Sequence, residues 1–402
     1  MQLKGVWRAL RIPRIPTLTV EGLCYITILG FLLAGALVRQ INLLLVLFSL
    51  LAGLPLVNRW LVWATLRRLQ VRRRIPRNVA AGDLLNVELE VSNVRRRLAS
   101  WAVTVTDRVC RQDPAVSEQT IIAKTLFSYI PARGAARHSY RGRITRRGRY
   151  HFGPLSISTR FPFGMIRVSH TIEQPQSLLV FPRLGHLSPR WQRLQQSSDL
   201  GTSNVQRRQG LLEGDFYGLR DWRPGDSRRW IHWRTSARRQ SPVVRQFEQQ
   251  RNQDLALVVE LWQPEHPSGV DLANVELAVS FAASIVSDLC RRGGRTLWIA
   301  IAAREPRFDS GPTSLALTRE VMESFAVVEA TSDDRLPDAV AKTLEVARPG
   351  TNTIVISTRP AEWTDTERFA RLWRSPRQRA WLGRLHTIDV SRPEVGDYFE
   401  PM

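Results

Sequence analysis

Lysine and cysteine are both scarce in this sequence of 402 residues. Only three of its 58 basic residues are lysines, so arginine supplies nearly all of the formal net charge of +22. The three cysteines, Cys24, Cys110 and Cys290, lie far apart and include no Cys-x-x-Cys pair. This spacing excludes a disulfide framework, and it fits a reducing compartment.

The sequence also lacks the short motifs that mark common active sites. It has no Gly-Lys pair for a phosphate-binding loop, no Gly-x-Ser-x-Gly nucleophile elbow and no His-Glu-x-x-His metal motif. The seven histidines are scattered, and His232, the most interesting of them, is more typical of a hydrogen-bonded structural residue than of a catalytic base. We therefore expect no catalytic residues, no cofactor and no enzymatic activity.

The excess of arginine has two interpretations, and both stay open on the sequence alone. Guanidinium groups form forked contacts with carboxylates and phosphates, so an anionic partner would suit them, whether lipid headgroups, nucleic acid or an acidic protein surface. A genome rich in G and C would also encode arginine in place of lysine. No recognisable nucleic-acid module accompanies the charge, so we expect no specific nucleic-acid partner.

Two uncharged apolar runs lie near the N-terminus, at Gly22–Val38 and Gln40–Asn58. Each is close to the length of about 17–25 residues that spans a bilayer. A cleavable signal peptide and a buried soluble hairpin are the alternatives, but the second run follows the first at once, without a cleavage site. Two transmembrane helices are therefore predicted, with Trp60 and Trp63 at one membrane interface.

The flanking charges predict the orientation of this hairpin. Arg39 is the basic residue of the short turn, whereas both outer flanks are basic, at Lys4, Arg8, Arg11 and Arg14 and at Arg67, Arg68, Arg72, Arg73, Arg74 and Arg77. Because cytoplasmic flanks carry the excess of Lys and Arg, both should be cytoplasmic. We expect a multi-pass protein of the inner (cytoplasmic) membrane with its C-terminal domains in the cytoplasm.

The region after the hairpin has the pattern of β-strands. Leu85–Val91 alternates apolar and polar residues, and Trp101, Val103 and Val105 alternate in the same way against Thr104 and Thr106. Further strands are predicted at Ile121–Ile130, Tyr150–Ser158, Met165–Val168 and Leu178–Phe181. Short strands separated by turn residues predict an antiparallel β-sandwich.

From about residue 255 the pattern changes to strands that alternate with helices. Strands are predicted at Leu255–Leu261, Leu297–Ala302, Thr353–Ser357 and Arg384–Val390, and helices at Asp271–Arg292, Thr318–Phe325, Asp334–Ala347 and Glu362–Trp373. This order predicts a parallel sheet with helices on both faces. The predicted domains are a basic N-terminus at 1–16, two transmembrane helices at 17–66, a β-sandwich at 67–182, a connecting segment at 183–254 and an α/β domain at 255–402.

The connecting segment interleaves acids, arginines and tryptophans. Pro224-Gly225 predicts a turn, and Asp226 is a plausible helix N-cap. Trp230, Trp233 and Ala237 would then share one helical face, where the tryptophans should be core anchors. We expect Arg220 and Arg238 to pair with nearby acids.

This segment resembles the signature of the family called domain of unknown function 58. The residues that carry the resemblance are Arg220, Pro224, Gly225, Asp226, Arg229, Trp230, Trp233, Ser236, Ala237, Arg238, Arg245, Phe247 and Glu248. Arg147-Gly148-Arg149-Tyr150, Pro162-Phe163-Gly164 and the twin apolar helices also match. The resemblance implies a C-terminal domain like von Willebrand factor type A and an association with AAA ATPases of the MoxR kind.

Type A domains often hold a divalent cation through Asp-x-Ser-x-Ser after their first strand. Here the corresponding residues are Glu260-Leu261-Trp262-Gln263-Pro264, so the serine oxygens are missing and no metal is expected. We predict a membrane-anchored adaptor whose type A-like domain binds a protein, with a candidate partner rim at Trp262, Gln263 and Arg359. The alternatives are a metal-dependent or hydrolytic enzyme that uses Glu260 and loop acids, and a protein that binds nucleic acid or anionic surfaces through its arginines.

Overall fold

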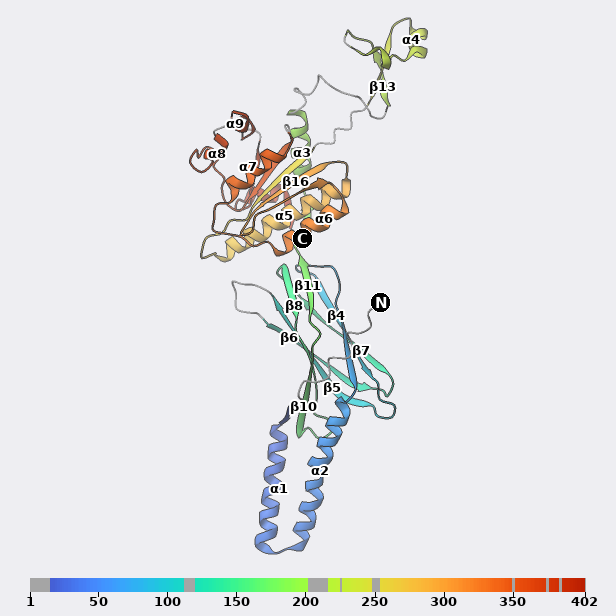
Figure 1. Cartoon of the computed structure of the whole chain (residues 1–402), viewed down its shortest axis with the longest axis vertical. Helices are drawn as coiled ribbons and strands as arrows, with labels where there is room; N and C mark the ends of the chain where they lie inside the picture. The colour runs from blue at the N-terminus through green and yellow to red at the C-terminus, as the bar shows by residue number, and fades with distance from the viewer. Residues whose placement is uncertain are drawn as a thin grey trace. The chain divides into compact units, whose positions relative to one another are not determined.

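The computed structural model describes residues 15–111, 120–201, 216–224, 226–247, 254–348, 351–373, 376–382 and 385–401. The chain divides into two compact units, Met1–Arg183 and Leu184–Met402 (Figure 1). The first unit contains two apolar helices and two β-sheets, and the second contains an α/β sheet.

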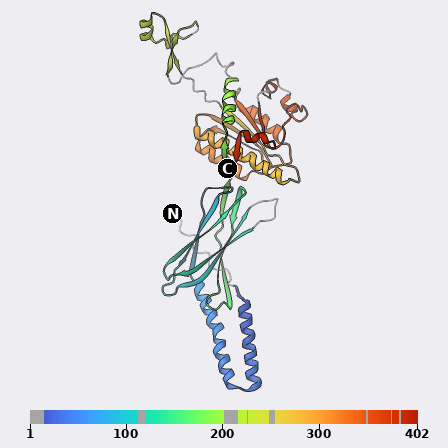
Figure 2. The same cartoon turned by 180° about the vertical axis from the view of Figure 1, so that it is seen from behind.

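Helices α1 (Val20–Arg39) and α2 (Asn42–Leu66) lie side by side as an antiparallel hairpin, drawn in blue (Figure 1, Figure 2). Both are long and apolar enough to cross a membrane. The Thr19 side chain caps α1 by accepting a hydrogen bond from the Gly22 amide at 3.1 Å. The Tyr25 hydroxyl of α1 donates to the Leu51 carbonyl of α2 at 2.9 Å, so one polar bond links the two helices.

The last turns of α2 belong to the core of the β-sheets. Val62 and Leu66 are buried in one apolar cluster with Val71, Val103 and Ile157. Each fully buried aliphatic side chain contributes about 1.5–3 kcal/mol relative to its exposed state. The helical hairpin and the β-sheets are therefore one structural unit.

An eight-stranded and a three-stranded sheet form a sandwich. The larger sheet has the order β1 (Ile15–Leu18), β10 (Ile166–Ile172), β9 (Leu155–Thr159), β5 (Ser100–Arg111), β8 (Gly148–Phe152), β11 (Gln176–Phe181) and β3 (Val79–Ala80), and β6 (Thr120–Ile130) also pairs with β5. The smaller sheet has the order β2 (Leu69–Arg74), β4 (Leu84–Asn93) and β7 (Ala135–Arg143). Leu89 and Val91 of the smaller sheet share a buried cluster with Val103 and Val105 of the larger.

The strand predictions for this region need several corrections. The predicted strand Tyr150–Ser158 is two strands, β8 and β9, because Gly153-Pro154 interrupts it. The sheets are not purely antiparallel, since β11 pairs with β3 in parallel. Strands β2 and β7 were not predicted, because arginines mask their alternation. The predicted basic N-terminus 1–16 overlaps β1, which pairs with β10.

Trp101 breaks the predicted alternation of β5. Val103 and Val105 are fully buried, but Trp101 is 47% exposed. The backbone of Ala102 between them has a φ of +46°, in the left-handed region that side-chain-bearing residues rarely adopt. This local twist turns Trp101 out of the core, and its ring contacts Tyr129 instead, with 4.5 Å between ring centroids.

The second unit is built on a five-stranded sheet. Its order is β17 (Arg307–Pro312), β16 (Thr296–Ala302), β15 (Leu255–Glu260), β18 (Asn352–Ser357) and β19 (His386–Asp389), and only β17 is antiparallel to its neighbour. Helix α7 (Leu336–Val346) packs on Val258, Ala300 and Val355 of one face. Helices α5 (Gly269–Arg292) and α6 (Leu315–Val327) lie on the opposite face (Figure 1).

Helix α5 is a third helix that is long and apolar enough to cross a membrane by length and composition. More than half of its most apolar window is buried inside the unit. Ser268 and Asp271 form a capping box at its N-terminus, with each side chain bonded to the other's backbone amide. Packing within the α/β unit accounts for the apolar composition of this helix.

One helix prediction for the α/β unit is wrong, and one strand was missed. The helix predicted at Glu362–Trp373 is confined to α8 (Ala370–Trp373), and turns precede it. The antiparallel edge strand β17 was not predicted. The predicted connecting segment 183–254 is also divided, because β12 (Gly185–Leu187) pairs with β20 (Phe399–Pro401) near the C-terminus. It is followed by α3 (Pro189–Gly201), whose Trp191 is buried against Phe281 of α5.

Candidate functional site

Glu260 is a buried carboxylate at the carboxyl end of β15, the central strand of the α/β sheet. Its residue is only 1% exposed, because β16 and β18 flank it on either side. Ligands of open α/β sheets bind beyond the carboxyl ends of the strands. Burial of an unpaired carboxylate would be costly, so the partners of Glu260 decide what this edge of the sheet can do.

Those partners are two arginines and a serine. Arg359, which follows β18, donates to Glu260 Oε1 from Nε at 3.0 Å and from Nη2 at 2.7 Å. Arg368, in the turns before α8, donates to the same oxygen from Nη2 at 3.1 Å. The Ser357 hydroxyl donates to Glu260 Oε2. The carboxylate is thus hydrogen-bonded through both oxygens.

Asp334 completes the group from the loop before α7. It accepts from Arg359 Nη2 at 2.6 Å and from Arg368 Nε at 2.7 Å. Burial alone would raise the pKa of Asp334, but the Arg368 hydrogen bond and the charges of Arg368 and Arg359 hold it below its ordinary value. Burial would lower the pKa of Arg368, and Asp334 and Glu260 raise it instead. The group is two carboxylates neutralised by two guanidinium ions.

Trp262 covers this charged group on one side. The Arg359 guanidinium carbon lies 4.6 Å from the centre of its ring, a cation–π distance. The indole Nε1 donates to the Ser332 carbonyl at 3.0 Å, and Thr358 bonds both the amide and the carbonyl of Trp262. The ring is therefore held in one orientation, half-buried.

The structure brings together the three residues of the predicted partner rim. Trp262 forms a parallel β-bridge with Thr331. The backbone amide of Gln263 donates a hydrogen bond to the Thr331 carbonyl at 3.0 Å. Arg359, however, turns toward Glu260 and its side chain is only 22% exposed. All three residues are partly exposed, and the Arg359 guanidinium lies over the Trp262 ring.

Sequence reasoning missed Asp334, Arg368 and Ser357 as members of this group. Asp334 and Arg368 each fall within a predicted helix, at Asp334–Ala347 and Glu362–Trp373. These residues lie so far from Glu260 in the sequence that no local pattern links them to it. The position of Ser357 at the end of a buried strand was the one available signal.

The occupied carboxylates leave little scope for metal or acid–base chemistry at this edge. A hard cation needs several oxygen ligands, whereas Glu260 and Asp334 already bind guanidinium groups. Among the described residues, no group of three or more His, Cys, Asp or Glu side chains is placed to hold a metal ion. A general base would also need a free carboxylate within reach of its substrate.

We expect that the purified full-length protein gives no magnesium or manganese heat attributable to Glu260 in titration calorimetry. The reason is that two fixed positive charges stand where a divalent cation would bind. Micromolar binding that disappears in Glu260→Gln, but persists in the exposed-carboxylate control Asp338→Asn, would contradict this prediction.

The signature segment forms a small hairpin of its own. It consists of β13 (Phe216–Asp221), the short 3-10 helix η1 (Arg228–Trp230), α4 (Trp233–Arg239) and β14 (Val243–Phe247). Arg220 binds both oxygens of Asp226, at 2.6 and 2.8 Å, which confirms the predicted pairing for Arg220. Among the ion pairs of the described residues there is none for Arg238, so that half of the prediction is not confirmed. That hydrogen bond lowers the pKa of Asp226, and the Arg223 amide, 2.9 Å away, lowers it further.

The helix predicted after Asp226 is wrong in two respects. Asp226 closes the turn at Arg223, whereas Ser227 caps η1 and His232 caps α4 through Nδ1. A break between η1 and α4 then separates Trp230 from Trp233, so that they do not share one helical face. Trp233 is 70% exposed and Trp230 is only partly buried, so the prediction that both are core anchors is wrong.

The signature residues are spread over the whole hairpin. Arg220 lies in β13, Pro224 and Asp226 in the turn, Arg229 and Trp230 in η1, Trp233, Ser236, Ala237 and Arg238 in α4, and Arg245 and Phe247 in β14, while Gly225 and Glu248 lie outside the described residues. The Ser236 hydroxyl accepts from the Val243 amide at 2.9 Å and so ties α4 to β14. Within the hairpin, these contacts have structural roles.

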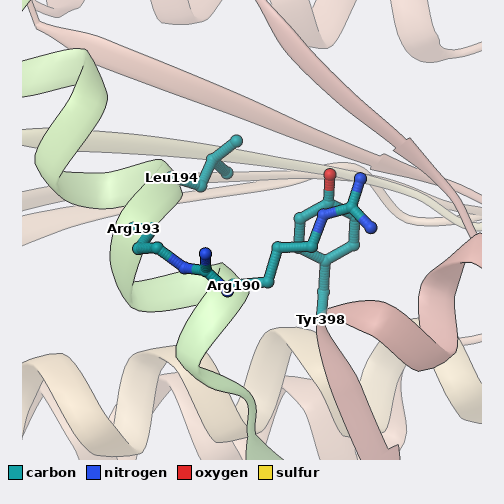
Figure 3. A pocket seen from close by; sticks show the side chains of 4 residues that line it. All are labelled: Arg190, Arg193, Leu194 and Tyr398. Atoms are coloured by element: carbon teal, nitrogen blue, oxygen red, sulfur yellow. The ribbon is translucent and has the colours of Figure 1, made fainter.

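A shallow hollow lies elsewhere in the α/β unit, between α3 and the C-terminal segment. Arg190, Arg193, Leu194 and Tyr398 line it (Figure 3). The Arg190 guanidinium lies 5.2 Å from the centre of the Tyr398 ring and pairs with Asp397. Its charge is therefore already balanced, and the hollow offers no set of catalytic groups.

Fold and site together define a protein with two apolar N-terminal helices, a β-sandwich and an α/β domain with a charge-compensated sheet edge. Residues 218–371 match the model of a family described as "Protein of unknown function DUF58". This match covers the signature hairpin and much of the α/β domain. It agrees with the resemblance found in the sequence.

The chain is also 25% identical over 251 residues to "Uncharacterized protein YeaD" of Bacillus subtilis (strain 168). The match covers 61% of this chain and 58% of that protein, so the chain spans little more than half of its relative's length.

Solved structures give only weak similarity. A β-glucosidase from Listeria innocua aligns with 28% of this chain, which corresponds to 16% of the β-glucosidase chain, at 11% identity and a TM-score of 0.19. A putative late embryogenesis abundant protein matches 29% of this chain and 75% of its own at 7% identity, with a TM-score of 0.21. Neither score supports an inference about fold or function.

Proposed function

We propose that this protein is a membrane-anchored, non-catalytic adaptor whose α/β domain binds a protein partner. The observation that carries the proposal is the Glu260 group: the carboxylate at the edge of the sheet is neutralised by Arg359 and Arg368. An enzyme that used Glu260 as a base or metal ligand would need that carboxylate free. A fixed, partly exposed tryptophan at the same edge, Trp262, suits protein binding better.

The domain is further proposed to be of the von Willebrand factor A-like type. In support, its first strand, β15, is central, and the sheet is parallel except for one edge strand. Glu260 ends that first strand, where such domains often carry a cation motif. The Arg359 and Arg368 guanidinium groups would then replace the cation in organising the loops around the site.

The proposed anchor is the α1–α2 hairpin, with both outer flanks in the cytoplasm. Arg59, Arg67 and Arg68 at the end of α2 favour that side over the turn, which carries Arg39. The proposed location is the inner membrane, and the proposed partner is a cytoplasmic AAA ATPase of the MoxR kind. Anchoring would raise the effective concentration of that ATPase near membrane clients.

Trp262 is the proposed contact residue, and Arg359 a positioning residue. Tryptophan is enriched among the residues that dominate interface energies. Trp262 is half-buried and fixed by hydrogen bonds to Ser332 and Thr358, so little side-chain entropy would be lost on binding. Gln263 beside it offers polar groups to the same partner.

We expect Trp262→Ala to weaken binding of a MoxR-type ATPase from the same genome by about 30-fold, the effect of losing a hot-spot side chain. The measurement is co-purification and biolayer interferometry with the full-length protein in nanodiscs, with ADP, ATP and no nucleotide. Arg319→Ala, an arginine whose side chain is 81% exposed on α6, is the control and should bind normally.

Two outcomes would contradict this assignment. Unchanged binding by Trp262→Ala, with loss of binding by Trp233→Ala, would move the partner surface to the signature hairpin. Failure to recover any ATPase under all three nucleotide conditions would remove the proposed partner.

A further inference from the structure

Three loops of the β-sandwich lie at the end where the helices enter it: residues 94–99, 131–134 and 160–165. Ser100, after the first loop, donates from its hydroxyl to the Thr65 carbonyl of α2 at 2.9 Å. In loop 131–134, the backbone amide of Arg133 donates a hydrogen bond to the Arg95 carbonyl of loop 94–99 at 2.9 Å. In loop 160–165, the Gly164 carbonyl accepts a hydrogen bond from the Thr19 hydroxyl at 2.7 Å.

These contacts fix the height of the loops relative to the helices. The uncharged part of α2 ends at Asn58. Further along the same helix, the backbone carbonyl of Ala64 accepts a hydrogen bond from the Arg95 guanidinium of the first loop. With a rise of 1.5 Å per residue, Ala64 lies about 9 Å beyond Asn58 along the helix. Thr19, the N-cap of α1, lies three residues before the other uncharged run begins at Gly22. Headgroups and amphipathic side chains occupy a layer of about 5–10 Å at this level.

The surface around these loops carries large apolar side chains that are exposed. They are Val94 (53% exposed), Leu98 (50%), Trp101 (47%), Tyr129 (48%), Phe161 (37%) and Phe163 (47%). Three of their rings form one group, since the Trp101 ring lies 4.5 Å from Tyr129 and 6.2 Å from Phe161. The left-handed backbone at Ala102 is what turns Trp101 toward this group. We call these six residues the aromatic rim.

Arginines surround the aromatic rim. Exposed guanidinium side chains of the same three loops and of the end of α2 are Arg59, Arg67, Arg68, Arg96, Arg97, Arg133 and Arg160. Glu21, in the first turn of α1, is an acidic residue at the same level. Aromatic side chains among basic ones are typical of proteins that contact the headgroup layer of an anionic membrane.

We propose that the aromatic rim is a second membrane contact, which lies in the headgroup layer of an anionic bilayer. The inference rests on the proposed membrane anchor, because the hairpin determines which surface the rim meets. The rim is continuous with the hairpin and lies at its interfacial level, and its charge is complementary to anionic lipids. The contact would hold the sandwich in one orientation on the membrane, where two helices alone would leave it free to tilt.

The test uses the full-length protein with Cys24, Cys110 and Cys290 replaced by alanine, reconstituted in nanodiscs that contain 30 mol% phosphatidylglycerol. A nitroxide is attached at Tyr129→Cys, and the matched control is Ile121→Cys. Both positions are exposed on β6, at 48% and 52%, and they lie about 27 Å apart along the strand. Phe31→Cys, 75% exposed on α1, reports on the hairpin itself.

The readout is the ratio of nitroxide collision with oxygen, which partitions into lipid, to collision with a water-soluble nickel chelate. We expect this ratio to be several-fold higher at Tyr129 than at Ile121, and highest at Phe31. Equal ratios at Tyr129 and Ile121, with a lipid-exposed Phe31, would overturn the rim contact and leave the anchor intact. A water-exposed Phe31 would overturn the anchor itself.

Charge-reversal variants test whether the rim contact requires anionic lipid or forms on any bilayer. Arg96→Glu with Arg97→Glu should lower the Tyr129 ratio in phosphatidylglycerol nanodiscs, because each arginine near an anionic surface shifts the local docking equilibrium by about five-fold. Arg141→Glu with Arg143→Glu, at the far end of β7, should leave it unchanged. No difference between these pairs, or the same ratio in nanodiscs of phosphatidylcholine alone, would overturn the role of anionic lipid.

Discussion

Replacement of Arg73 by methionine is expected to lower the free energy of unfolding of the β-sandwich by about 3–5 kcal/mol, the usual effect of removing one member of a buried ion pair. The side chains of Arg73 and Asp107 are both inaccessible to solvent, with 2.6 Å between Nη1 and Oδ1. Tyr140 also donates to Asp107, at 2.7 Å. The variant would leave a buried carboxylate without its cation.

The pKa of Asp107 indicates how the variant would respond. Burial raises the pKa of this carboxyl group, although Tyr140 and Arg73 act to lower it. Without Arg73 we expect Asp107 to take up a proton in the folded state. That protonation would recover part of the lost free energy and would make the variant's stability fall as the pH rises.

Urea unfolding of the protein in detergent, followed by tryptophan fluorescence, measures this effect. The control is Arg74→Met, because the Arg74 side chain is 58% exposed and its pair with Glu90 should contribute only about 0–1 kcal/mol. The double variant Arg73→Met with Asp107→Leu should be more stable than Arg73→Met alone. Equal stability of Arg73→Met and Arg74→Met would contradict the assignment.

Trp191→Ala is expected to destabilise the α/β domain by about 3–5 kcal/mol. Trp191 is fully buried, and its ring meets Phe281 of α5 edge-on at 5.5 Å. Phe281 in turn stacks on Phe399 at 5.0 Å. The variant would open a cavity between α3, α5 and the C-terminal strand β20.

Trp233→Ala is the matched control, since this tryptophan is 70% exposed and its loss should change stability by no more than about 0.5 kcal/mol. The measurement is thermal unfolding in detergent, together with limited proteolysis of the C-terminal strand. If Trp233→Ala were the more damaging variant, Trp233 would be an anchor after all, and the structure of the hairpin would have to be revised.

Apolar runs and side-chain alternation were enough to predict the main elements. The two uncharged runs became α1 and α2, the alternation at Leu85–Val91 became β4, and the apolar run after residue 255 became the central strand β15. The prediction that Arg220 pairs with a nearby acid was also confirmed, because Asp226 is only six residues away. These features depend on neighbours in the chain.

Arginines caused two of the missed strands, β2 and β7. β2 reads Leu-Gln-Val-Arg-Arg-Arg, and the third inward position is Arg73, which the sequence presents as a surface residue. Its inward orientation depends on Asp107 and on the Gly153 and Gln174 carbonyls, all contributed by other parts of the chain. The interior of the sandwich therefore made Arg73 a core residue.

The sequence by itself determined that the chain carries an apolar hairpin, a β-rich region and an α/β region with Glu260 where a cation motif would stand. Only the tertiary structure decided what surrounds Glu260, because Asp334, Arg359 and Arg368 meet there from separate loops. The aromatic rim likewise gathers from two loops and from strands β5 and β6. Local patterns report a residue's chain neighbours, whereas ion pairs and surface patches depend on how strands and loops are brought together in space.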